Sequence, residues 1–225
     1  MALDYVTLKT LHPYVLPHVS GCPPAQVDNA LRLAAIDFLR STQFWTHEPA
    51  AVSIVSTEPH YTITIPAFST IERILSARWR DTVDTEATPL GGYSESEMEQ
   101  RHGGSWREDT GAPTEFIHDE QGPETIRLYP IPDDDFTSAL LLKVSLVPSL
   151  DCQKLPGWVA RRYHQAICAL ARANLMAIPE KEWTNPVFSA AEQREYEEKL
   201  TIAISDRMTG HQTKSQKMVA RYPLA

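Results

Sequence analysis

Two short acidic runs carry the side chains best suited to chemistry. Residues 133–135 are three consecutive aspartates, and His118 is followed directly by two further acids. Carboxylates and a histidine can hold a divalent cation that activates a water molecule. One function they allow is that of a small metal-dependent accessory hydrolase, with Asp133, Asp134 and His118 at its centre.

The spacing of these residues argues against that function. The three aspartates follow Pro-Ile-Pro and lack the alternating spacing of a calcium-binding loop. His118 stands at the tip of an expected hairpin. We therefore expect both runs to be solvent-exposed turns, and we predict no metal site.

Other catalytic motifs are absent from the sequence. It contains no phosphate-binding GxxxxGK[ST], no GxGxxG, no HExxH and no GxSxG elbow. The three cysteines, Cys22, Cys152 and Cys168, are far apart and form no CxxC pair. The sequence predicts no enzyme and no cofactor.

The elements that position these residues begin and end as helices. Helical spacing of apolar residues predicts helices over 23–41, 156–177 and 189–208. Prolines open the first two, and Ser189 with Glu192 resembles a capping box at the start of the third.

Between about residues 48 and 148 the apolar period changes from 3.6 to 2. We expect a hairpin of residues 52–57 and 61–65, a strand over 71–80, a short helix over 94–101, a second hairpin of residues 115–118 and 125–129, and a strand over 139–147. The predicted fold is α+β and mainly helical, a helical frame with a small antiparallel β insertion. It has an N-terminal arm (1–22), one domain (23–210) and an extended C-terminal tail (211–225).

Charge and composition exclude several classes of protein. The 225 residues have a formal net charge of −8, and much of the acidity lies in residues 82–124. No concentrated basic face is expected, which argues against a general DNA-binding protein. No apolar run is long enough to span a membrane. The first residues do not resemble a signal peptide, so we expect synthesis in the cytoplasm.

The order of the elements is itself a signal. A helix ending in Phe44-Trp45 leads into a strand, and a β insertion contains the run Leu-Tyr-Pro-Ile-Pro-Asp that ends at Asp133. The chain then has Leu-Pro-Gly-Trp at 155–158 and a helix with Arg-Arg-Tyr at 161–163. Over roughly residues 20–210 this order resembles the head-to-tail adaptor (connector) proteins of tailed bacteriophages, particularly the short-tailed type.

The resemblance implies a structural virion protein at the head–tail junction. Twelve copies would form a ring beneath the portal protein, carry the tail nozzle or fibre proteins, and surround a channel for DNA. An acidic lumen repels phosphate, so DNA would pass without sequence-specific binding. A tail-completion (neck) protein of a long-tailed phage is a further alternative.

Two sets of residues are candidates for contacts in such a ring. The two closing helices have opposite charge balances, which suits contacts between unlike faces of neighbouring subunits. The interface candidates are Arg161, Arg162, Arg172, Glu195 and Glu198. The alternative is that these charges pair only within one subunit.

The tail supplies the candidates for portal binding. They are the basic residues Lys214, Lys217 and Arg221, which would meet acids, and the apolar residues Tyr222 and Leu224, which would fill pockets. The alternative is that the tail is a plain frayed terminus.

Overall fold

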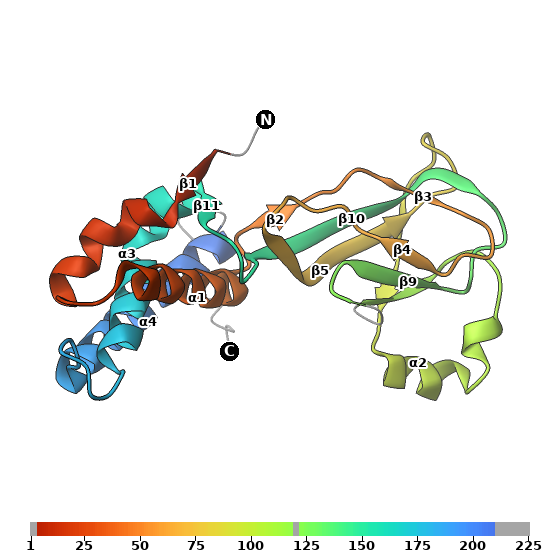
Figure 1. Cartoon of the computed structure of the whole chain (residues 1–225). Coiled ribbons are helices and arrows are strands. Elements are labelled where there is room, and N and C mark those ends of the chain that lie inside the picture. The colour runs from red at the N-terminus through yellow and green to blue at the C-terminus, as the bar shows by residue number, and fades with distance from the viewer. Residues whose placement is uncertain (1–3, 119–121, 210–225) are drawn as a thin grey trace, which may run out of the picture.

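A computed structural model of the chain describes residues 4–118 and 122–209. Its described residues form two parts that lie end to end (Figure 1). The helical body consists of residues 4–45 and 149–209, and the β arm consists of residues 46–148 with the gap at 119–121.

Three long helices form the helical body. They are α1 (Pro24–Thr42), α3 (Gly157–Met176) and α4 (Pro186–Thr209). The three predicted helices are confirmed, the first two to within one residue at each end. The apolar stripe predicted for α1 is buried, including Val27, Leu31 and Phe38, because it packs against α3.

The start of α4 differs from the prediction. The helix begins at Pro186, three residues early, and the side chain of Asn185 accepts a hydrogen bond from the main-chain N–H of Phe188 (3.2 Å). Ser189 is therefore inside the first turn, and its hydroxyl donates to the carbonyl of Ala173 on α3 (2.8 Å). The predicted Ser189 capping box is wrong, because that hydroxyl serves a contact between helices.

The described part of the predicted N-terminal arm packs against the helices. Strand β1 (Tyr5–Thr7) pairs antiparallel with β11 (Lys154–Pro156), and two short 3₁₀ helices follow, η1 (Leu8–Tyr14) and η2 (Leu16–His18). Leu8, Leu11, Val15 and Val19 are all buried in the main core.

Two sheets make up the β arm. The first has the order β2–β10–β5–β6, with β3 also paired to β10; its strands are β2 (Thr46–His47), β3 (Val52–Ile54), β5 (Ser69–Trp79), β6 (Thr88–Pro89) and β10 (Phe136–Pro148). The second has the order β4–β9–β8–β7; its strands are β4 (His60–Thr62), β7 (Gly91–Gly92), β8 (Glu115–His118) and β9 (Thr125–Tyr129). All pairs are antiparallel except β7 with β8.

The predicted strand over 71–80, the strand over 139–147 and the second hairpin are confirmed as β5, β10 and β8–β9. The first hairpin is wrong, because β3 pairs with β10 whereas β4 pairs with β9. In the segment that connects β3 to β4, the carbonyl of Val55 accepts a hydrogen bond from the Tyr61 hydroxyl of β4 (3.0 Å). This contact holds the connecting loop, although the two strands do not pair with each other.

The proportions of the fold also differ from the prediction. About 41% of the described residues are helical and 26% are in strands, so the fold is α+β but not mainly helical. The insertion covers the predicted range, but its strands form two sheets where one small sheet was expected.

That short helix, α2 (Glu95–His102), is confirmed, and it has a true capping box formed by Ser94 and Glu97. With the 3₁₀ turn η3 (Trp106–Glu108) it packs on the second sheet. The two elements enclose a small separate core of Met98, Trp106, Ile117 and Tyr129.

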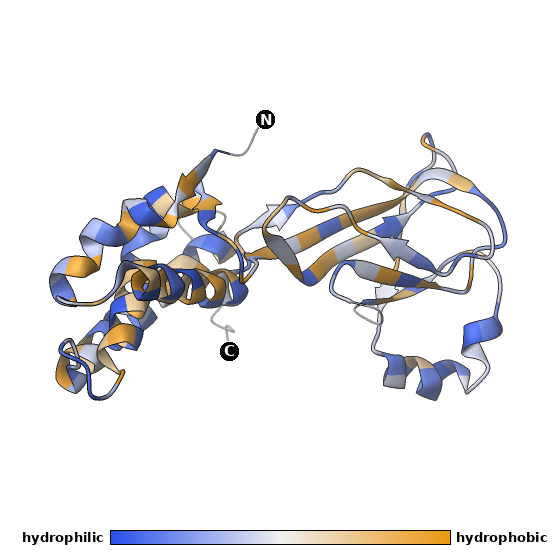
Figure 2. Ribbon diagram, in the orientation of Figure 1, coloured by the Kyte–Doolittle hydropathy of each residue, from blue (hydrophilic) through white to orange (hydrophobic). Residues whose placement is uncertain are grey.

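The junction of body and arm is well packed. Trp45 is buried there, and its carbonyl accepts a hydrogen bond from the N–H of Leu146 on β10 (2.7 Å). Phe44 stacks on Tyr163 of α3, with ring centroids 5.0 Å apart. Hydrophobic residues along β10 and β5 continue the core of the helices into the arm (Figure 2).

Candidate assembly interface

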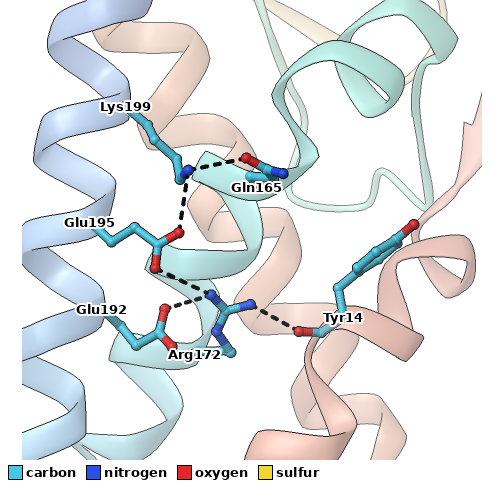
Figure 3. Close-up of polar contacts among 6 residues, drawn as sticks. All are labelled: Tyr14, Gln165, Arg172, Glu192, Glu195 and Lys199. Carbon is cyan, nitrogen blue, oxygen red and sulfur yellow. Dashed lines mark hydrogen bonds and ion pairs between the residues drawn. The ribbon is translucent and has the colours of Figure 1, made fainter.

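Arg172 of α3 stands at the centre of a polar network between three elements of the helical body (Figure 3). Its guanidinium contacts the carboxylate of Glu192 on α4 (2.6 Å) and donates to the carbonyl of Tyr14 at the end of η1 (2.9 Å). The side chain is only 11% exposed. The network therefore fixes α4 and η1 against α3.

The same network includes Glu195, which lies 4.0 Å from Arg172 and 3.3 Å from Lys199. Lys199 in turn donates to the side-chain carbonyl of Gln165 (3.1 Å). Two of the five predicted interface residues, Arg172 and Glu195, thus form contacts inside the subunit. Arg161 and Arg162 also pair within the subunit, so the alternative of pairing within one subunit describes the observed contacts of all four.

The other three interface candidates are at the surface. Arg161 pairs with Asp4 (3.0 Å) and Arg162 lies 3.7 Å from Asp206, in pairs whose members are all more than 40% exposed. Glu198 is exposed on α4. Exposed pairs of this kind exchange partners at little cost, so these residues stay predicted interface residues.

Sequence reasoning missed a set of exposed apolar side chains on the helical body. On α4 they are Val187, Phe188, Ile202 and Met208, and on α1 there is Leu33. Met208, near the end of α4, is 85% exposed. The sequence does indicate this exposure. Tyr196 and Ala203 mark the buried face of the helix, and Val187, Phe188 and Ile202 do not lie on that face.

The acidic runs have structural roles. The carboxylate of Asp135 accepts a hydrogen bond from the N–H of Ser56 (2.6 Å), and the carbonyl of Asp133 accepts one from the Ser56 hydroxyl (3.0 Å). The ring of His118 contacts the carbonyl of Pro123 (2.9 Å) across the β8–β9 hairpin. Among the residues that the structure describes, no three potential metal ligands come together. The arrangement gives the metal-dependent hydrolase no support.

Three of the eleven acids in residues 82–124 pair with basic side chains around α2. Arg107 pairs with Glu95 and with Glu99, and Glu115 contacts both Arg101 (3.3 Å) and His102 (2.8 Å). Hydrogen bonds from Ser94 lower the pKa of Glu97, as expected for the carboxylate of a capping box. These contacts hold α2 in place on the arm.

The predicted portal-binding residues Lys214, Lys217, Arg221, Tyr222 and Leu224 lie outside the described residues. The described chain ends beside the junction, where Arg207 donates to the carbonyl of Thr42 (2.7 Å). Within residues 4–118 and 122–209, no helix is both long and apolar enough to cross a membrane.

Exposed apolar side chains such as those on the helical body often mark a surface that contacts another protein. Residues 16–221 match the family described as SU10 adaptor protein, and the chain belongs to this family of bacteriophage adaptor proteins. It is a structural component of the virion, and membership of an adaptor family implies a non-enzymatic role. No curated protein sequence matches the chain.

Proposed function

We propose that twelve copies of the chain form a ring that joins the portal protein to the tail of a short-tailed phage. The single observation that carries this proposal is the membership of the adaptor family over residues 16–221. The ring would contact the portal on one side and the tail nozzle or fibre proteins on the other.

The two-part shape supports an orientation for each subunit in the ring. The helices would pack side by side around the DNA channel, and the β arm would point outward, where tail proteins attach. Helix α4 holds five acids and three bases, and the chain as a whole has a net charge of −8. A channel wall of that sign repels phosphate and lets DNA slide.

Contacts between neighbouring subunits would include Arg161, Arg162 and Glu198, whose side chains are at the surface. Exposed ion pairs each contribute about 0–1 kcal/mol and are screened by salt. A free subunit would therefore be a monomer or weakly associated, and the ring would form on the portal.

The C-terminal tail would provide the portal contact. Its basic residues Lys214, Lys217 and Arg221 would meet acids on the portal, and Tyr222 and Leu224 would fill pockets. The contact of Arg207 with Thr42 supports this, because it gives the tail a fixed starting point at the base of the body.

Electron microscopy of the protein mixed with the portal of the same phage tests the proposal. We expect twelvefold rings on the portal with arms pointing outward. Binding elsewhere in the particle, for example at the end of a completed long tail, would instead identify a tail-completion protein. Absence of any binding to the portal would contradict the adaptor role.

A further inference from the structure

We infer that neighbouring copies join through an aromatic knob, Phe188, that enters an apolar groove between α1 and α3 of the next copy. This inference rests on the proposed ring, and it names the residues that connect one subunit to the next. Both surfaces belong to the helical body.

The knob is exposed but rigidly held. Phe188 is 60% exposed in the first turn of α4. Its own N–H donates to the capping side chain of Asn185 (3.2 Å), and the N–H of Asn185 donates to the carbonyl of Met176 (3.0 Å). Presenting a large apolar ring on a fixed backbone lowers the entropy lost on binding.

The groove is apolar and carries no charged side chain. Leu175 and Ala30 are buried, Leu33 and Ile178 are accessible apolar side chains, and the polar part of the lining consists of the amides of Gln26, Asn29 and Asn174. Its volume is about 510 Å³, which is larger than a phenyl ring needs. Leu33 is 40% exposed although it is a leucine on a helix of the main core.

Knob and groove lie at the same height along the helices. The contacts of Asn185 with Met176 and of Ser189 with Ala173 place Phe188 beside the last turn of α3. The groove includes Asn174 and Leu175 of that same turn. In a ring whose helices pack side by side around a central axis, a surface of one subunit faces the surface at the same height on the next subunit.

They also lie on different sides of α3. Phe188 lines a hollow together with His18 and Ser20, which belong to or follow η2, whereas the groove is formed with α1. A head-to-tail ring needs two different and complementary faces on each subunit, and it uses each face once per copy. A second copy of this chain is therefore the occupant that the groove fits.

The flank of α4 that carries the knob continues along the helix. Glu195 and Ile202 follow Phe188 at intervals of seven residues, which places all three on one flank. Ile202 is 55% exposed. The predicted interface residue Glu195 thus lies between two apolar side chains of the same contact surface.

Cross-linking on the portal tests the contact. The doubly substituted protein, Phe188→Cys with Leu33→Cys, is bound to the portal and treated with a short bis-maleimide. The native thiols are suitable for this design, since Cys22, Cys152 and Cys168 are buried and burial raises the pKa of each. The matched control is Val187→Cys with Leu33→Cys, because Val187 is at least as exposed as Phe188 but points about 100° away around α4.

We expect the double variant to give a ladder of covalent multimers and the control to give little or none. An equal mixture of the two single variants should give dimers only, because each contact then joins one knob to one groove. As a check on folding, Phe188→Asp should keep the melting temperature and lose ring formation.

Three results would overturn the inference. They are rings without a ladder, covalent dimers of Phe188→Cys alone, and adducts between either cysteine and the portal. Rings without a ladder leave the proposed adaptor function intact. A ladder from free protein that does not bind the portal supports the contact and contradicts the proposed function.

Discussion

Arg207 of α4 donates from its Nη1 atom to the main-chain carbonyl of Thr42, the last residue of α1, at 2.7 Å. The same atom lies 3.0 Å from the side-chain oxygen of Gln43, which ends α1 in a left-handed conformation with φ of 49°. A cation at the carboxyl end of a helix is favourable because the last carbonyls have no partner within the helix. The contact therefore closes the helical body where the β arm begins.

Replacing this arginine tests the contact. Arg207→Ala should lower the free energy of unfolding by about 1–2 kcal/mol, since a hydrogen bond from a charged group is lost. That corresponds to a fall of about 2–8 °C in the melting temperature, measured by circular dichroism. Arg194→Ala, an exposed arginine on the same helix, is the control and should change it by less than about 1 °C. Equal falls for both variants would contradict a specific role for Arg207.

The pair of Arg172 and Glu192 should behave as a partly buried ion pair. Removing one charge alone, as in Glu192→Gln or Arg172→Met, leaves the other poorly compensated and should cost up to about 3–5 kcal/mol. The double variant should be more stable than the sum of the two single changes predicts. Chemical denaturation measures all three, and strict additivity would show that the two side chains do not interact.

Trp106 should stabilise α2 without stabilising the helical body. Trp106→Ala removes the largest side chain of the small core in the β arm and should cost about 3–5 kcal/mol in that core. Hydrogen exchange should show faster exchange in α2 and unchanged protection in α1, α3 and α4. Met98→Leu, which conserves volume in the same core, is the control and should leave α2 protected. Loss of protection throughout the chain would mean that the two cores unfold together.

Charge reversal at Arg161 and Arg162 should weaken assembly more than folding. Both arginines are in exposed pairs, with Asp4 and Asp206, so the change in melting temperature should be small. Binding to the portal, followed by electron microscopy, should fall markedly at low salt. Charge reversal at Arg194 is the matched control. A loss of stability as large as the loss of assembly would contradict an interface role.

Deletion of the residues after Gly210 tests the proposed portal contact. The melting temperature should stay unchanged, because the described contacts of the helical body end at Arg207. Ring formation on the portal should be abolished. The variant Tyr222→Ser with Leu224→Ser should show the same loss if those two side chains fill pockets. Normal assembly of the truncated protein would exclude the tail as the portal contact.

Much of the fold was predictable because its signals are local. The apolar stripe of α1, the short helix α2 and the alternation of β5 and β10 each depend on residues close in the chain. Pairing of strands is not local. Val52–Ile54 and His60–Thr62 alternate like two arms of a hairpin, yet they join different sheets whose partner strands come much later in the sequence.

The candidate interface was predictable only in part for a similar reason. Charge counts on α3 and α4 singled out Arg172 and Glu195, but they could not show that α4 places Glu192 against that arginine within the subunit. The exposed Phe188 was missed because an aromatic residue near a helix start is usually packed inside. Asn185 caps α4, and with the helix starting there the Phe188 side chain is exposed.

Strand β10 has 13 residues and runs along the arm to the helical body, and its register against β5 shifts after Lys143 and after Ser145. At the junction it pairs with β5 on one side and with β2 on the other, next to the buried Trp45. A sideways load on the arm would act on many backbone hydrogen bonds at once, because those bonds lie across the strand axis. The arm is therefore built as a stiff lever about 40 Å long, and a small displacement at its tip would turn the helices beneath it.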